Sequence, residues 1–267
     1  MLPSAHVLDL FAVPGDVEPL PGGQGASVRA GDLVLSPGRD PGVCAWLNPV
    51  LARTAVRLDE RPGRSPRDLR IAMPVPARDG EWVVEGWGAS RWEPGTTRCT
   101  DVDVLVATGR LLHAELASVV PERPPGLARR EDRWAQAERE AFDGTPSGPE
   151  LVRRLAAMRD AAPLGRDQLV HADLAGNVLL DGAGAPVVID LAPAWRPHRW
   201  AEATCVLDAV LWLDAPAARI RDWTSGPDLQ AMVRAALFRL LSDTDPDLDR
   251  YERALAPVLA SAGRELS

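Results

Sequence analysis

The stretch VHADLAGNVLL, at residues 170–180, leads from a polar loop into an apolar run. Within the loop, His171, Asp173 and Asn177 offer an imidazole, a carboxylate and an amide, and Gly176 allows a tight turn. Such a loop either carries chemistry or is a polar turn that leads into a strand. The residues that follow it, and the residues missing far upstream, decide between these two interpretations.

Two short apolar strands are predicted at residues 177–180 and 186–189, joined by the turn DGAGA. Because a hairpin returns its second strand beside its first, Asn177 and Asp190 should lie close together. An amide oxygen and a carboxylate are the hard donors that Mg²⁺ on a nucleotide phosphate accepts from protein. Asp173 would then face an acceptor hydroxyl as base or orienter, which is the arrangement of kinase-type phosphoryl transfer.

The loop and the strand after it resemble the catalytic loop and metal-binding strand of the aminoglycoside phosphotransferases and their protein-kinase-like relatives. The likeness rests on His171-x-Asp173, on Asn177, and on the run VVID that ends at Asp190. Three longer runs, VIDLAPAWRPHRWAEATCVLDAVLW, PLPGGQGASVRAGDLVLSP and VVEGWGASRWEPG, are more specifically similar to an actinobacterial branch of that superfamily. Asn177 lies four residues after Asp173 instead of the usual five, so we expect a tighter loop.

The resemblance implies an α+β, bilobal, protein-kinase-like fold. Residues 1–93, which read as strands and turns, would form a small antiparallel-sheet N-lobe with a Gly-rich turn. Residues 94–267 read mainly as amphipathic helices and would form a larger C-lobe that carries the catalytic loop and the metal-site hairpin.

The resemblance also implies roles for the polar residues of the loop. Asp173 would be the catalytic base or orienter, and a carboxylate that merely caps a turn is the alternative. His171, grouped here with the catalytic residues, would mainly hold the loop backbone by hydrogen bonds. Asn177 and Asp190 would bind Mg²⁺.

ATP is the phosphate donor that the resemblance implies. The Gly-rich turn would cover its phosphates, although glycines also make ordinary hairpins, and backbone groups around residues 85–89 would hold the adenine. The candidate nucleotide-binding residues are Gly22, Gly23, Gly25, Ser36, Glu85 and Trp87.

One part of the superfamily pattern is missing from this chain. The strand after the Gly-rich turn usually carries a Lys that holds the phosphates, and a Glu on the next helix pairs with that Lys. Here Ser36 stands at the Lys position, all 30 basic residues are arginines, and residues 41–58 contain no acid. Losing both charges together is coherent, because one buried charge left alone would cost several kcal/mol. Arg39 or Arg29 would have to reach the phosphates instead, although neither lies where the motif asks.

Three functions remain compatible with these residues. The first is an ATP- and Mg²⁺-dependent phosphotransferase that acts on a hydroxyl of a small molecule. The second is a catalytically impaired kinase-like protein that binds or regulates, and the third is a kinase-like cleft reused for other chemistry. The retained Asp173, Asn177 and Asp190 favour the enzyme, whereas Ser36 and the acid-free segment favour the alternatives.

The amino-acid composition limits the classes of partner that the protein is expected to bind. A net charge of −8 and a pI near 5.1 argue against nucleic acid or an anionic membrane and are compatible with a cationic small molecule. The acidic run SDTDPDLDRYE is better explained as a solvated face than as a substrate site. Three scattered cysteines make neither a disulfide framework nor a zinc site, so a reducing cytoplasm fits best. We expect neither a signal peptide nor a membrane span.

Overall fold

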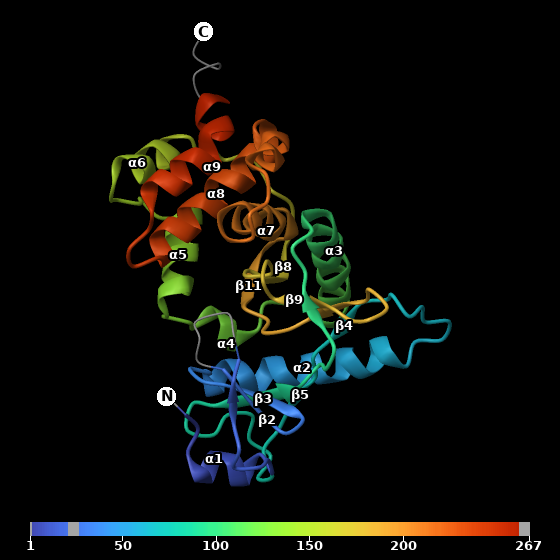
Figure 1. Cartoon of the computed structure of the whole chain (residues 1–267). Helices are drawn as coiled ribbons and strands as arrows, with labels where there is room; N and C mark the ends of the chain where they lie inside the picture. The colour runs from blue at the N-terminus through green and yellow to red at the C-terminus, as the bar shows by residue number, and fades with distance from the viewer. Residues whose placement is uncertain (1, 21–26, 262–267) are drawn as a thin grey trace. The chain divides into compact units, whose positions relative to one another are not determined.

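The structure is a computed structural model that describes residues 2–20 and 27–261. The chain folds as two units, one made of Met1–Arg98 with Val178–Asp190 and the other of Cys99–Asn177 with Leu191–Ser267. Figure 1 shows the elements of each unit. The expected division at residues 93 and 94 placed the hairpin in the helical lobe. In the structure the hairpin belongs to the first unit, because its strands pair with strands of that unit.

The first unit contains a five-stranded antiparallel sheet. The core beneath it includes Leu33 and Leu35, which alternate with partly exposed residues along their strand, and Phe11, next to helix α1 (Ala5–Leu10). In sheet order, the strands are β1 (Glu18–Pro19), β2 (Val28–Ala30), β3 (Leu33–Ser36), β6 (Gly88–Arg91) and β5 (Pro74–Val75).

A second sheet of the first unit holds the predicted hairpin. Its strands, in sheet order, are β4 (Arg70–Ile71), β10 (Pro186–Val188), β9 (Val178–Leu180) and β7 (Thr97–Arg98). Strand β10 pairs antiparallel with β9, with Val188 opposite Val178, and parallel with β4. The hairpin predicted from the sequence is therefore present.

Helix α2 (Pro41–Asp59) follows β3 and is longer than a sequence with Pro49 in its middle suggests. Its start is well specified, because the Asp40 carboxylate accepts a hydrogen bond from the Val43 backbone N–H at 2.9 Å and Pro41 occupies the first turn. The helix begins immediately after Arg39, and this position matters for the site.

The second unit is mainly helical. A two-stranded antiparallel sheet places His171 opposite Pro193, and most side chains of the helices α7 and α8 are buried. Within the described parts of the chain, no helix is both long and apolar enough to cross a membrane. The elements are α3 (Val102–Val119), α4 (Pro125–Ala128), α5 (Arg133–Phe142), α6 (Glu150–Ala157), β8 (Asp167–His171), β11 (Pro193–Pro197), α7 (His198–Trp212), η1 (Ala217–Trp223), α8 (Gly226–Ser242) and α9 (Leu248–Ser261).

Candidate functional site

His171 ends strand β8 and is completely buried. Its backbone N–H donates to His113 Nε2 of α3 at 3.0 Å, and its own Nδ1 accepts a hydrogen bond from the Asp173 backbone N–H at 3.1 Å. Burial, and then the nearby His171 and His198, lower the pKa of His113 to about 3, so His113 is a neutral acceptor. The two histidines therefore fix the loop backbone, and the role of His171 in catalysis stays a prediction.

The loop after Asp173 is held by packing and by a tight turn. A Cβ atom on Gly109 of α3 would lie 2.8 Å from Leu174 Cδ2, so this glycine makes room for Leu174 against the helix. Gly176 adopts a φ of +88°, and the Asn177 backbone N–H donates to the Leu174 carbonyl at 2.9 Å. Both glycines are needed where they stand, one for space and one for conformation.

Asp173 is held by hydrogen bonds to both of its carboxylate oxygens. Oδ1 accepts from Arg239 Nη2 at 2.7 Å, and Oδ2 accepts from Asn177 Nδ2 at 3.3 Å. The side chain of Asp173 is nevertheless 47% exposed. A carboxylate that is held in place and still reaches solvent can accept a hydrogen bond from a bound hydroxyl.

Arg239 on α8 is a buried cation that links Asp173 to a second carboxylate, Asp208 on α7. Arg239 Nε donates to Asp208 Oδ1 at 2.8 Å, and Nη2 donates both to Asp208 Oδ2 and to the Ala172 carbonyl, the latter at 3.1 Å. Burial lowers the pKa of Arg239, but Asp208 and Asp173 raise it by more, so the guanidinium remains charged. Arg239 thus fixes both the carboxylate and the backbone of the loop.

Sequence reasoning missed Arg239, Asp208 and the role of His113. A usable signal was present, because CVLDAVLW and ALFRLLS each carry one charged residue in an apolar helical run. A charge at such a position is almost never buried without a partner. Two such positions in neighbouring helices point to a buried pair.

Asn177 fits the role of an oxygen donor to a metal ion. Its Nδ2 donates to the Asp173 carbonyl at 2.6 Å as well as to the Asp173 carboxylate, so the amide oxygen is the end that faces away from Asp173. Among the described residues no three His, Cys, Asp or Glu side chains form a metal cluster. An amide oxygen is a hard donor of the kind that Mg²⁺ accepts from protein, and Mg²⁺ binding at Asn177 stays a prediction.

Asp190 follows β10 with a φ of +46° and pairs with an arginine of its own unit. Arg39 Nη1 donates to Asp190 Oδ1 at 2.5 Å, and the two side chains are 30% and 47% exposed. Asn177 belongs to the other unit, so its closeness to Asp190 stays a prediction from the hairpin register.

The predicted nucleotide-binding residues fall into three groups. Gly22, Gly23 and Gly25 lie outside the described residues. Ser36, at the expected Lys position, makes a 3.0 Å hydrogen bond with the Ser27 hydroxyl, so it has a structural partner. The remaining two, Glu85 and Trp87, belong to a turn and to the core.

Glu85 and Trp87 both have structural roles at the tight turn formed by Glu85 and Gly86. Both turn residues have positive φ, at +50° and +79°, and the Val84 and Trp87 backbones pair on either side of them, as in a tight hairpin. The Glu85 carboxylate accepts a hydrogen bond from the Ser4 hydroxyl at 2.7 Å. The Trp87 side chain is only 3% exposed and packs in the core. Neither placement favours an adenine contact through the side chain.

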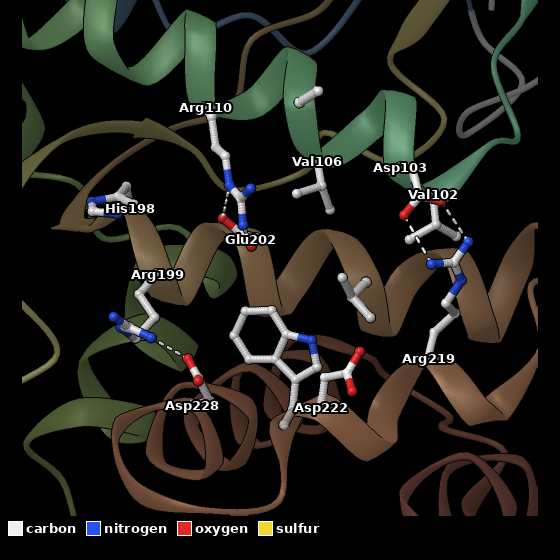
Figure 2. A pocket seen from close by; sticks show the side chains of 13 residues that line it. Val102, Asp103, Val106, Arg110, His198, Arg199, Glu202, Arg219, Asp222 and Asp228 are labelled. Carbon is white, nitrogen blue, oxygen red and sulfur yellow. Dashed lines mark hydrogen bonds and ion pairs between the residues drawn. The ribbon is translucent and has the colours of Figure 1, made fainter.

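A hollow of about 670 Å³ lies elsewhere in the second unit, between α3, α7, η1 and the start of α8. Figure 2 shows that each arginine lining it is paired with a carboxylate, whereas Asp222 lines it without a marked pair. None of the predicted site residues lines this hollow. The pairs are Arg110 with Glu202, Arg219 with Asp103, and Arg199 with Asp228.

Comparison with known proteins identifies the fold. No protein-family model matches the chain, and no curated protein matches its sequence. An aminoglycoside phosphotransferase from Alicyclobacillus acidocaldarius has a similar structure, with a TM-score of 0.54 and 14% identity over 99% of this chain and 96% of that one. A choline kinase from Streptococcus pneumoniae gives 0.48 and 15% over 95% and 96%. A spectinomycin phosphotransferase solved with ADP and spectinomycin gives 0.48 and 12% over 97% and 96%.

At such low identity the likeness shows the fold alone. It confirms the α+β, protein-kinase-like architecture that the sequence motifs predicted, on the similarity to the Alicyclobacillus phosphotransferase. The similarity to an actinobacterial branch stays a prediction.

Proposed function

We propose that the protein is an ATP- and Mg²⁺-dependent phosphotransferase that acts on a hydroxyl of a small molecule. The observation that carries this proposal is the loop at Asp173. Its carboxylate is exposed, its orientation is fixed from one side by Arg239 and from the other by Asn177, and its backbone is fixed by two buried histidines. This degree of preorganisation is what a residue that orients a nucleophile requires.

Each predicted residue has a distinct task in this proposal. Asp173 would accept a hydrogen bond from the acceptor hydroxyl and take its proton, while the hydroxyl oxygen bonds to the terminal phosphorus of ATP and the bond from that phosphorus to ADP breaks, so that ADP leaves. The amide oxygen of Asn177 and the carboxylate of Asp190 would hold Mg²⁺, which would neutralise charge on the phosphates. The Gly-rich turn at residues 22–25 would cover the phosphates from the first unit.

The acceptor is a small molecule, and the net charge of −8 is compatible with a cationic one. The hollow in Figure 2 is a poor binding site for such a cation, because three of the four carboxylates that line it are already paired with arginines. Cationic amines and amino sugars that carry hydroxyls are the first acceptors to assay.

The second candidate is a kinase-like protein that binds nucleotide and no longer transfers phosphate. It is favoured by Ser36, whose hydroxyl is engaged by Ser27 instead of a charge that could hold phosphate. It is also favoured by helix α2, which offers no acid before Asp59. Binding and turnover must therefore be measured separately.

Thermal unfolding with ATP, with Mg²⁺ and with both tests nucleotide binding. A ligand present at about 100 times its Kd stabilises the folded state by roughly 2.7 kcal/mol. We expect Asp190→Ala to abolish the part of the shift that requires Mg²⁺. No shift at millimolar nucleotide would reject both the phosphotransferase and the nucleotide-binding candidate.

Turnover separates the two candidates. We expect Asp173→Asn to keep nucleotide binding and to lower ATP-dependent product formation by about 10²–10⁴-fold, the range of a general base. Asp245→Asn is the matched control, because Asp245 is an exposed carboxylate of the acidic run near the C-terminus. Binding without turnover in the wild-type protein would establish the second candidate.

A further inference from the structure

Arg39 lies at the junction between strand β3 and helix α2, three residues after Ser36. Its backbone N–H donates to the Gly86 carbonyl at 2.9 Å, in the same turn that contains Glu85. The next residue, Asp40, caps α2. The start of the Arg39 side chain is thus fixed from both sides.

The aliphatic part of the Arg39 side chain packs against Gly88, which is paired with the position where the superfamily carries its Lys. Gly88 on β6 is the register partner of Ser36 on β3. A Cβ atom on Gly88 would lie 3.1 Å from Arg39 Cγ and 3.7 Å from Arg39 Cβ, so the missing side chain of this glycine makes room for the arginine. The Arg39 side chain therefore starts outside the strand and lies against the register partner of Ser36.

The guanidinium of Arg39 ends on the carboxylate of Asp190, the predicted metal ligand, at 2.5 Å. An arginine guanidinium is not deprotonated in proteins, so Arg39 is a permanent cation. A guanidinium has five N–H donors in a planar fork that matches the oxygens of a phosphate. Its partial exposure leaves it accessible to a ligand.

Arg29, the other arginine that the sequence offered, is used elsewhere. Its Nε donates to the Gly31 carbonyl at 3.0 Å, and its guanidinium lies 5.1 Å from the ring centre of Trp92. It also pairs with Glu18 at 3.6 Å. The structure thus distinguishes Arg39, which contacts Asp190, from Arg29, which does not; the sequence alone could not make this choice.

We infer that Arg39 supplies the phosphate-binding cation in place of the absent Lys, reaching the nucleotide from the start of helix α2 beside Asp190. This inference rests on the proposed function. It also accounts for the acid-free helix, because Asp190 and the Gly86 carbonyl hold Arg39 and no helix carboxylate is required. The two losses from the superfamily pattern then have one explanation.

The test is titration of the whole protein with ATP and with adenosine, each with Mg²⁺ and with a chelator. We expect Arg39→Ala to weaken ATP binding by about 10- to 100-fold in both conditions, the range of a hydrogen bond to a charged group, and to leave adenosine binding unchanged. Arg39→Lys should fall between, because it keeps the charge and loses the planar fork. Arg29→Ala is the matched control and should bind ATP like the wild type.

The outcomes separate this inference from the function on which it rests. Wild-type protein that binds no ATP would overturn the proposed function, and this inference with it. Wild-type protein that binds ATP, together with an Arg39→Ala protein that binds ATP equally well, would overturn the inference alone. Circular dichroism and thermal unfolding without ligand establish whether each variant is folded. If Arg39→Ala does not fold, ATP binding by Arg39→Lys tests the inference in its place.

Discussion

The two units each hold one predicted site carboxylate with an arginine, and the two arginines differ in burial. In the first unit, Arg39 and Asp190 are 30% and 47% exposed. In the second unit, Arg239 and its partner Asp208 are 7% and 1% exposed, and only Asp173 of that cluster reaches solvent. An arginine paired with an aspartate thus occurs once near the surface and once in the core.

Burial decides which purpose is possible. A buried ion pair that loses one partner leaves a charge without solvent or counter-ion, which costs about 3–5 kcal/mol. A partly exposed pair can exchange one partner for water or for a ligand, and such pairs are worth about 1 kcal/mol or less. We therefore infer that Arg239 holds Asp173 in place and that Arg39 is a cation able to bind phosphate.

The strongest test of this contrast is Arg239→Met. We expect it to lower the free energy of unfolding by about 3–5 kcal/mol, because Asp208 is left buried with no cation. Chemical denaturation measures this change. Arg39→Met, the matched change at the exposed pair, should cost about 1 kcal/mol or less. Equal losses at the two arginines would break the comparison.

A double variant separates support of the fold from support of Asp173. Arg239→Met with Asp208→Leu removes the whole buried pair, and such replacements are often neutral for stability. We expect the double variant to regain most of the stability that Arg239→Met loses. Its turnover should stay low, because the Asp173 carboxylate still lacks the hydrogen bond from Arg239. Turnover that recovers together with stability would show that Arg239 only supports the fold.

The buried side of the comparison also includes His113. Its pKa is near 3 in the folded protein and 6.5 as an ordinary histidine, so the unfolded chain binds more protons between these values and acid favours unfolding. Linkage gives a loss of about 2 kcal/mol from His113 between roughly pH 8 and pH 5. We expect His113→Gln, which keeps an acceptor for the His171 backbone N–H, to remove this part of the pH dependence. Identical pH profiles of unfolding for both proteins would contradict it.

The sequence predicted the parts of the site that depend on neighbours along the chain. The hairpin after Asn177 and the turn at Gly176 follow from short-range patterns of apolar and turn residues, and both are present. The α+β class followed from the same patterns and from the resemblance. The sequence did not assign the hairpin to the first unit, because that assignment depends on pairing between β10 and β4, a strand far away in the chain.

The contacts that fix the site are the ones the sequence did not predict. Arg239 and Asp173 are 66 positions apart, and His113 and His171 are 58 apart, so no local pattern links them. Arg39 was named from the sequence, but only together with Arg29. The choice between them depends on the space left by Gly88, which is a property of packing.

Gly88→Ala tests the exposed side of the comparison without removing a charge. Its new Cβ would lie 3.1 Å from Arg39 Cγ and force the stem to shift by a few tenths of an ångström. We expect ATP to bind roughly two- to fivefold more weakly, less than the tenfold that 1.4 kcal/mol represents. Gly182→Ala is the matched control, because a Cβ there meets nothing within 4 Å. Unchanged ATP binding would mean that the position of the Arg39 guanidinium does not depend on the space beside Gly88.

The smallest effect should come from a pair that touches neither site. Arg110 and Glu202 form two hydrogen bonds, at 2.8 and 2.5 Å, at the edge of the hollow in Figure 2. The Arg110 side chain is 64% exposed, so a double-mutant cycle with Arg110→Ala and Glu202→Ala should give a coupling of about 0.2–1 kcal/mol that shrinks with salt. A coupling as large as the loss at Arg239 would show that paired geometry, and not burial, sets the value of these ion pairs. The distinction drawn between Arg39 and Arg239 would then have no physical basis.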